Sequence, residues 1–420
     1  MSHVDYLRSL EYLGIKLGLD QIRRLVAALD QPDRAGPAII VAGTNGKGSV
    51  AAMVERGLRA AGHRTGRYTS PHLVRLNERF AIDGSPIDDA WLERAAGRVR
   101  HAARHLPAPP SFFEATTALA LDVFREAAVD VSVLEVGLGG RLDATNVVAA
   151  AAVAITAVDF DHEQFLGDTL PAIAAEKAGV IKPGCVVVLG ENPPEVRDVV
   201  VEACRRVSAP LSLATEVEAR DVAFEDGHVR ATLASPVRTY GPLTLGLAGR
   251  HQWPNARVAV RMLEVVDAAG LLPVPASAVR TGVEDVVWAG RLQTIEGPHG
   301  PLLIDGAHNP GGAATLAAHV LETFGRRLPI VTGIMADKAI DRMLAALAPA
   351  AAAFVCTAAR SPRAARPADL LAHARRVAPE VPAEAVADPH AAIARAAALG
   401  SPVVVAGSLY LAGDVLADLS

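Results

Sequence analysis

A chain of 420 residues is long for one hydrophobic core and predicts two domains, because single cores stop growing beyond roughly 250–300 residues. Hydrophobic residues make up 51% of it and aromatic residues only 4%, which is typical of an enzyme interior built from Ala, Val and Leu. The net charge of −5, from 41 basic and 46 acidic residues, excludes the basic field that non-specific nucleic-acid binding requires. We therefore expect no nucleic-acid partner.

The cysteines and the N-terminal segment indicate the compartment. Three scattered cysteines are too few for a disulfide framework or a zinc cluster, which favours a reducing environment. Asp5, Arg8 and Glu11 stand where a signal peptide needs an apolar run, and no stretch of 18 apolar residues follows. We expect a cytoplasmic protein with no membrane span.

The first part of the chain alternates between apolar strands and helices around a glycine-rich loop. The loop at residues 43–49 follows an apolar run and precedes a helical pattern over residues 50–61, and another helix is predicted over residues 20–29. This order predicts a doubly wound, mainly parallel α/β sheet with a phosphate loop. The apolar runs that predict its buried strands are residues 38–41, 129–136 and 151–157.

The pattern changes after this sheet. Short β-rich pieces between residues 211 and 247, broken by turn residues, predict a small antiparallel sheet added to the first domain. Residues 290–300 lose all periodicity, so we place a boundary there, with one domain over residues 1–295 and a smaller, Rossmann-like α/β domain over residues 296–420. The elements expected around this boundary are helices over residues 251–269 and 276–287 and strands at residues 302–304, 329–331, 353–355 and 403–405.

The loop at residues 43–49 reads Gly-Thr-Asn-Gly-Lys-Gly-Ser. After a strand and at the start of a helix, its backbone N–H groups are expected to converge on phosphate oxygens, with Lys47 reaching the β- and γ-phosphates. It departs from the common phosphate-loop pattern in two ways. Val41 stands where the first glycine belongs, and Gly48 separates Lys47 from the hydroxyl of Ser49. A glycine-rich turn without a ligand is the alternative interpretation.

Acidic side chains follow two strands of the first domain at the carboxyl ends, where α/β sheets gather ligands. Glu135 ends one strand, and Asp159, Asp161 and His162 follow the next. A carboxylate there is suited to Mg²⁺, and a metal role for His162 is a hypothesis. A buried salt-bridged Glu135 and a structural His162 are the alternatives.

Two further segments have different interpretations. In the second domain, Asp305 and His308 follow a strand, and Asn309 with Pro310 predicts a helix N-cap and first turn. The N-cap does not explain Asp305 or His308. Taken alone, Lys177 is interpreted as part of a solvated helix end before Gly179.

These segments together resemble the folylpolyglutamate synthase and dihydrofolate synthase family, a branch of the Mur ligase superfamily. The resemblance covers most of the chain. It implies an ATP-dependent, ADP-forming ligase that activates a substrate carboxylate as an acyl phosphate and joins it to the amine of L-glutamate. The matching motifs are residues 43–49, 69–73, 77–79, 113–117, 135–146, 161–162, 176–179, 251–256, 305–310, 337–338 and 407–410.

The resemblance also implies roles for individual residues. Catalysis is expected from Lys47, Lys177 and His162. Contacts to ATP are expected from Gly46, Lys47, Gly48, Ser49, Asn255, Arg291 and Asp305. Ligands of Mg²⁺, at two expected sites, are Ser70, Glu135, His162 and Lys177, with Lys177 carbamylated as a hypothesis. The pterin-bearing substrate, dihydropteroate or a reduced folate, is expected near Thr69, Pro71, His72, Arg79 and Phe113, and L-glutamate near His308 and Ser408.

Departures and alternatives accompany these expectations. Ala289 stands where related chains often have Pro, which affects the stiffness of a hinge expected near Glu296. One alternative is a cell-wall Mur ligase, but only 42 residues precede Gly43, fewer than a further N-terminal domain needs. The other is a phosphate-loop switch that performs no synthesis. We expect a monomer that joins L-glutamate both to dihydropteroate and to folates.

Overall fold

Strand β1 (Ala38–Ala42) is buried along its whole length at the centre of the first sheet. Because successive side chains of a strand point to opposite faces, Ile40 belongs to one hydrophobic core, and Ile39 and Val41 belong to another. Apolar layers on both faces are what the sequence predicted for a covered parallel strand. The computed structural model describes residues 2–14 and 16–419.

The first sheet has eight strands in the order β4-β3-β2-β5-β1-β6-β7-β8. The strands from β2 to β8 in this order run parallel, and β3 and β4 form an antiparallel edge. The chain places β2 and β5 on one side of β1 and β6 on the other, so the loops after β1, β5 and β6 open onto one crevice. The further strands are β2 (Thr65–Tyr68), β3 (Phe80–Ile82), β4 (Ser85–Pro86), β5 (Val131–Glu135), β6 (Ala150–Ile155), β7 (Val186–Leu189) and β8 (Leu211–Leu213).

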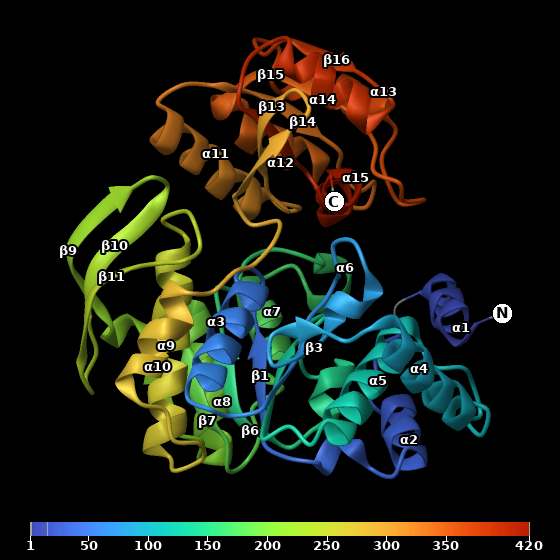
Figure 1. Cartoon of the computed structure of the whole chain (residues 1–420), viewed down its shortest axis with the longest axis vertical. Helices are drawn as coiled ribbons and strands as arrows, with labels where there is room; N and C mark the ends of the chain where they lie inside the picture. Colours follow the sequence, from blue (N-terminus) through green and yellow to red (C-terminus); the bar gives the residue numbers. More distant parts are fainter. Residues whose placement is uncertain (1, 15, 420) are drawn as a thin grey trace.

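Two layers of helices cover this sheet (Figure 1). The predicted helix at residues 20–29 is confirmed as α2, and the one at residues 50–61 begins three residues earlier, at Lys47. One layer contains α1 (His3–Ser9), α2 (Asp20–Ala28), α4 (Asp89–Ala103), α5 (Phe112–Glu126), α6 (Glu163–Leu166), α7 (Leu170–Ala178) and α8 (Pro194–Val207). The other contains α3 (Lys47–Ala60), α9 (Gln252–Ala268) and α10 (Ala276–Glu284).

A three-stranded antiparallel sheet extends the first body beside α9 and α10 (Figure 1). Its strands are β9 (Glu218–Glu225), β10 (His228–Ala234) and β11 (Thr239–Thr244). The predicted small sheet is therefore present, but its predicted start is wrong. Residues 211–213 form β8, which pairs in parallel with β7 at the edge of the large sheet. A three-residue strand has too little sequence pattern to predict which sheet it joins, so pairing in the tertiary structure decides its place.

The second body is a separate mixed sheet in the order β12-β13-β17-β14-β15-β16. The predicted strands at residues 302–304, 329–331, 353–355 and 403–405 are all present. The strands are β12 (Gln293–Gly297), β13 (Gly300–Ile304), β14 (Leu328–Thr332), β15 (Ala351–Cys356), β16 (Ala383–Ala385) and β17 (Val403–Ala406). One face carries α11 (Pro310–Phe324), α12 (Ile340–Leu347) and α13 (Pro367–Val377), and the other carries α14 (Pro389–Ala397) and α15 (Leu409–Leu419).

The segment at residues 290–300 is not the irregular connection that we predicted. Strand β12 lies within it and pairs antiparallel with β13, Glu296 opposite Pro301. The half-exposed edge position of β12 explains its weak apolar pattern. Glu296, near which we expected a hinge, lies in β12, so the proposed boundary at residue 296 falls inside a strand of the second sheet. The chain between α10 and β12 comprises residues 285–292.

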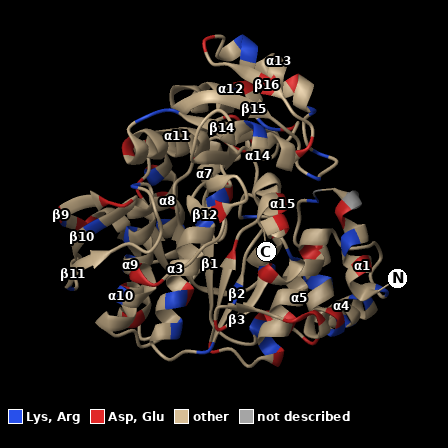
Figure 2. Ribbon diagram, turned by 45° about the horizontal axis from the view of Figure 1, so that its top comes forward, with Lys and Arg blue, Asp and Glu red and all other residues tan. Residues whose placement is uncertain are grey.

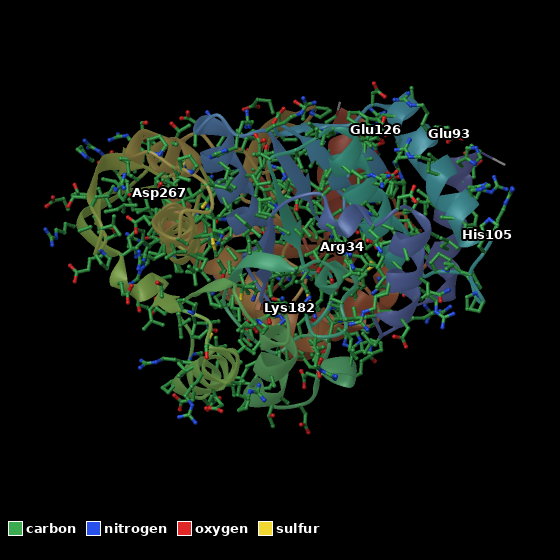
Figure 3. The ribbon with its side chains drawn as sticks, turned by 90° about the horizontal axis from the view of Figure 1, so that it is seen from below. Arg34, Glu93, His105, Glu126, Lys182 and Asp267 are labelled. Carbon is green, nitrogen blue, oxygen red and sulfur yellow. The ribbon has the colours of Figure 1, made fainter. Side chains whose placement is uncertain are left out.

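Charged side chains are spread over both bodies. Lys and Arg alternate with Asp and Glu across the ribbon (Figure 2). In the view from below, Glu93, His105, Glu126 and Asp267 lie toward the rim (Figure 3). Within the described ranges, no helix has both the length and the apolar character that crossing a bilayer requires.

Candidate active site

A cavity of about 420 Å³ lies at the carboxyl ends of β1, β5 and β6, and residues of the second body form part of its wall. Its volume is in the range of small-molecule sites. The first body contributes Gly43, Thr44, Asn45, Gly46, Lys47, Gly48, Ser49, Ser70, Pro71, Glu135, Asp159, Asp161, His162, Lys177 and Asn255, among others. The linker and the second body contribute Arg291, Asp305, His308 and Asn309.

The glycine-rich loop presents the N-terminus of α3 to this cavity. Gly46 has a left-handed backbone (φ 86°) at the N-cap, and a Cβ there would stand 2.1 Å from Oδ1 of Asn255. Glycine is therefore required at this position. The first N–H groups of a helix have no partner within the helix, so those of Lys47, Gly48 and Ser49 are available to an anion.

Lys47 lies inside the cavity without a close carboxylate. Its Nζ donates to the carbonyl of Thr44 at 2.9 Å, and no Asp or Glu oxygen among residues 2–14 and 16–419 lies within 4.0 Å of it. Burial lowers the pKa of Lys47, and the charges of Glu135 and Asp161 oppose that shift. An anionic ligand would supply the missing counter-charge.

Two buried acids near the loop have different surroundings. Asp143 accepts hydrogen bonds from the backbone of Leu138 (2.8 Å) and Thr145 (3.0 Å) and from the Thr145 hydroxyl (2.5 Å), so it holds the backbone of its own loop. Glu135 accepts a hydrogen bond from the N–H of Ser70 at 3.1 Å, and burial raises its pKa. Unlike Asp143, Glu135 lines the cavity, and the bond from Ser70 is the one hydrogen bond to its carboxylate among the described residues.

His162 and Asp161 follow β6 as the sequence predicted. His162 has a left-handed backbone (φ 53°), and burial lowers the pKa of its imidazole to about 4, against the pull of Asp161. The ring is therefore neutral at pH 7 and can offer a lone pair. Burial raises the pKa of Asp161, but His162 and Lys338 outweigh it and bring that pKa to about 2. The bond from Lys338 Nζ to Asp161 Oδ1 (2.8 Å) links the two bodies.

Lys177 is buried, so its interpretation as part of a solvated helix end is wrong. Its side chain is 4% exposed, and Nζ donates to the carbonyl of Gly43 at 2.8 Å. The loop after β5 covers this end of α7, since the amide of Arg141 donates to the carbonyl of Glu176 at 2.8 Å. Burial, with the charge of Lys47, lowers the pKa of Lys177 to about 7.

The proposed metal ligands line one cavity but form no ready-made cage. Ser70, Glu135, His162 and Lys177 all face it. No three His, Cys, Asp or Glu side chains converge anywhere in the part of the chain that the structure describes. Mg²⁺ is usually held by one or two carboxylates together with substrate phosphates and water. A hydroxyl and a sparsely bonded carboxylate beside a phosphate loop fit that requirement.

The expected nucleotide contacts also meet at the cavity. The side chain of Asn255 lies against Gly46 and donates to Gln252 Oε1 at 2.9 Å. The two carboxylate oxygens of Asp305 accept from the N–H groups of Leu292 (2.9 Å) and Ala307 (2.8 Å). Asp305 therefore fixes the linker beside Arg291, and burial raises its pKa.

The residues expected near the pterin divide into two groups. Pro71 lines the cavity, whereas Thr69, His72, Arg79 and Phe113 do not. These four form a cluster with Tyr68 beside the cavity, and the Phe113 ring lies against Gly137 of the cavity wall. Arg79 Nε donates to His72 Nδ1 at 2.9 Å, Thr69 N donates to the carbonyl of Arg79 at 3.2 Å, and the Phe113 ring centroid is 5.9 Å from that of Tyr68.

The two residues expected near L-glutamate also differ. His308 faces the cavity, with Nδ1 2.9 Å from the carbonyl of Gly306, and burial lowers its pKa to about 4. Ser408 does not line the cavity. Its Oγ accepts from the N–H of Leu411 at 3.0 Å at the start of α15, which is a helix-capping contact.

Sequence reasoning missed a contact between the two bodies. Asn309 caps α11 as predicted, with Oδ1 accepting from Gly312 N at 2.8 Å. Its Nδ2 also donates to Asn45 Oδ1 at 2.9 Å, across the cavity. The only sequence signal was the position of Asn45 inside the phosphate loop, and nothing in the sequence relates residues 264 positions apart.

Comparisons with known proteins agree with this architecture. The family description "Mur ligase middle domain" matches residues 41–263, and "Mur ligase, glutamate ligase domain" matches residues 290–409. The Bacillus subtilis protein named dihydrofolate synthase/folylpolyglutamate synthase is 32% identical, over 96% of this chain and 95% of its own length.

Two solved structures show the same fold. The Mycobacterium tuberculosis folylpolyglutamate synthase complexed with ADP superposes with a TM-score of 0.90 at 34% identity, covering 99% of this chain and 98% of that one. A bifunctional folylpolyglutamate synthase/dihydrofolate synthase with Mn, AMPPNP and L-glutamate bound gives 0.86 at 30% identity, covering 100% and 98%. The fold of this chain is therefore that of the enzymes with these names.

Proposed function

We propose a function from one premise: this chain belongs to the Mur ligase family, in the branch of the folylpolyglutamate and dihydrofolate synthases. It is an ATP-dependent amide ligase that releases ADP and phosphate. Its substrates are L-glutamate and a pterin-bearing acid, and the bifunctional name of the Bacillus subtilis relative supports both dihydropteroate and folates as acceptors.

The observation that carries this proposal is the composition of the cavity. A phosphate loop from the first body faces Asp305, His308 and Asn309 of the second. A nucleotide switch needs the loop alone, whereas a ligase must bring a phosphoryl donor, an acid and an amine together. A cavity lined by both bodies offers places for all three reacting groups.

In the first step, the γ-phosphoryl group moves from ATP to an oxygen of the acceptor carboxylate. Lys47 and the N–H groups at the start of α3 hold the phosphates and offset charge that spreads over their oxygens. In the second step, the amine of L-glutamate attacks the acyl carbon, the C–N bond forms, the C–O bond to phosphate breaks, and the nitrogen loses a proton as phosphate leaves. The cavity between the bodies limits the access of water, which would otherwise hydrolyse the acyl phosphate.

We propose Ser70, Glu135, His162 and Lys177 as the residues that hold Mg²⁺, at two sites. Bound Mg²⁺ would neutralise phosphate charge during transfer. The solved relative with Mn and AMPPNP bound supports a divalent metal in this family. The neutral ring of His162 and the sparsely bonded carboxylate of Glu135 are suited to ligation.

Lys177 as an ammonium would repel a metal ion, so we propose that it carries a carbamate. The amine must be neutral to react with CO₂, and a pKa of about 7 gives a substantial neutral fraction at physiological pH. The modified side chain would be an anionic oxygen ligand. Intact-protein mass measured in bicarbonate buffer, with a Lys177→Ala control, tests this assignment.

An assay of substrate dependence tests the proposal as a whole. ADP release is measured with ATP, Mg²⁺ and L-glutamate, adding dihydropteroate in one series and tetrahydrofolate in another, and the product is identified by its added glutamate mass. Turnover that requires the acceptor supports the ligase. ATP turnover without any acceptor would support a switch, and turnover only with a cell-wall nucleotide-sugar acceptor would support the other Mur activity. We also propose that the protein is a monomer in the cytoplasm. Size-exclusion chromatography tests the oligomeric state, and cell fractionation tests the location.

A further inference from the structure

Gly48, the additional glycine of the phosphate loop, is not explained by its backbone. It is the second residue of α3, and it is absent from the positive-φ positions. Glycine in a helix costs about 1 kcal/mol relative to alanine, so another constraint must favour it here. That constraint is space on its outer side.

The indole of Trp288 fills that space. A Cβ at position 48 would stand 3.0 Å from Nε1 of Trp288 and 3.2 Å from both Cε2 and Cζ2. These distances are shorter than ordinary van der Waals contact, so a side chain at position 48 would force Trp288 to move. Trp288 itself is half-buried and lies four residues after the end of α10.

Trp288 also contacts a buried arginine. The guanidinium carbon of Arg67 lies 4.7 Å from the centroid of the Trp288 ring, a cation–π contact. Arg67 is 9% exposed, and its Nη1 lies 3.4 Å from Oε2 of Glu55, which is on α3. The Nε of Arg67 is buried without a hydrogen-bond partner among the described residues, so stacking on the ring is a principal contact of this group.

Trp288 lies on the linker at the point where it approaches the cavity. Helix α10 packs along α3, and the chain then passes from α10 toward the second body (Figure 1). Three residues after Trp288, Arg291 lines the cavity. The linker is tied to the second body between them, since Gly306 N donates to the carbonyl of Gly290 at 2.8 Å.

We propose that Trp288 is a positioning residue that clamps the interdomain linker onto the first turn of α3. It acts through Arg291 and the backbone of α3, and it is not itself a catalytic group. The contact keeps the phosphate-binding N–H groups and Arg291 at a fixed separation, so nucleotide meets both at once. Glycine is favoured at position 48 because a Cβ there would push the Trp288 ring out of this position. The inference rests on the proposed use of ATP.

A double-mutant cycle tests the clamp. The affinity for a non-hydrolysable ATP analogue is measured by calorimetry, with Mg²⁺ and without acceptor, for the unmodified chain, Gly48→Ala, Trp288→Leu and the double variant. We expect each single change to weaken binding about tenfold or more, and the double variant to be no weaker than Trp288→Leu alone within about twofold. The two losses are then not additive, because alanine at position 48 weakens nucleotide binding only by displacing Trp288.

Two outcomes would overturn the inference. If the two losses multiply in the double variant, Gly48 is needed for another reason, such as close approach of phosphate. If Trp288→Leu binds nucleotide normally, the linker needs no clamp. Kinetics add a second readout: we expect Trp288→Leu to raise KM for ATP while KM for the acceptor stays unchanged at saturating ATP, and a general structural defect would move both.

The matched control is Trp253→Leu. Trp253, on α9, also stacks with an arginine, Arg257, at 5.4 Å, but it is not among the nearest neighbours of a Cβ at position 48. Its loss should not interact with Gly48→Ala, so this second cycle should be additive. Thermal unfolding establishes that every variant is folded before binding is measured. An unmodified chain that binds nucleotide but synthesises no glutamyl product would refute the proposed function and leave the clamp tested by the binding cycle.

Discussion

The phosphate end of the cavity and the Tyr68 cluster, which comprises Tyr68, Thr69, His72, Arg79 and Phe113, differ in how their polar groups are satisfied. At the phosphate end, Lys177 is buried and Lys47 is half-buried, and among the described residues their ammonium groups donate to the backbone carbonyls of Gly43 and Thr44. In the Tyr68 cluster, side chains bond to one another: Arg79 to His72, and the hydroxyl of Tyr68 to Thr116 at 2.8 Å.

The two regions therefore differ in how their polar groups would respond to a ligand. Buried ammonium groups without carboxylate partners are costly until an anion arrives, so the phosphate end gains most from its ligand. In the Tyr68 cluster the polar side chains already have protein partners, so we expect any selection of the acceptor there to depend on fit and hydrogen-bond geometry. Substitutions at the phosphate end should therefore reduce activity strongly and change stability little. Substitutions in the Tyr68 cluster should instead change the KM for the acceptor.

The largest effect is expected from Lys47→Met. We predict a loss of about a thousandfold or more in kcat/KM for ATP, because the charge that offsets the phosphates is removed. The free energy of unfolding without nucleotide should stay the same or rise, because the substitution removes a half-buried cation that has no carboxylate partner among the described residues. Steady-state kinetics measure kcat/KM for ATP, and denaturant unfolding measures the free energy of unfolding. Lys16→Met, at an exposed position, is the control. A large loss of stability would contradict this difference between the two regions.

The next effect is that of Lys177→Ala, for which we predict a loss of about a hundredfold in kcat, partly restored by added short carboxylic acids.

The carbamate forms from the neutral amine, so its occupancy in bicarbonate should rise as pH increases through about 7. The folded pKa is below the ordinary value of 10.5, so the unfolded state binds more protons between them. In unmodified protein this group therefore adds stability as pH rises through that window. Mass spectrometry checks the carbamate occupancy, and unfolding at several pH values checks the stability. If added carboxylic acids do not restore the activity of Lys177→Ala, that result counts against the modification.

A smaller and more selective effect is expected in the Tyr68 cluster. Arg79→Gln removes the donor that orients the His72 ring, so KM for the pterin-bearing acceptor should rise about tenfold, while KM for ATP stays within about twofold. Arg75→Gln, an exposed arginine nearby, is the control. If Arg79→Gln raises KM for ATP instead, the two regions are not separate in function.

The smallest effect concerns His319, outside both regions. Burial lowers its pKa to about 4, below the ordinary value of 6.5. The unfolded state thus binds more protons between these values, and stability falls as pH drops through that window. His319→Gln should flatten the dependence of the unfolding midpoint on pH between 6.5 and 4 without changing kcat at pH 7.5. An unchanged slope would show that the burial of this ring has no energetic consequence.

Much of the fold follows from local pattern. Continuous apolar runs placed β1, β5 and β6, because strands covered on both faces need apolar side chains at every position. Turn residues and short apolar runs likewise placed most of the second sheet. Strands β8 and β12 were misread because a short edge strand carries little pattern, and hydrogen bonding to a neighbour distant in sequence decides where it belongs.

The sequence by itself determined the phosphate loop, the acids at strand ends and their order, since each is a local motif with its own chemistry. Only the tertiary structure decided that Lys177 is buried against Gly43, that Asn309 reaches Asn45, and that Trp288 covers Gly48. Burial, pKa and steric exclusion depend on which elements meet. Residues hundreds of positions apart carry no local signal of that meeting.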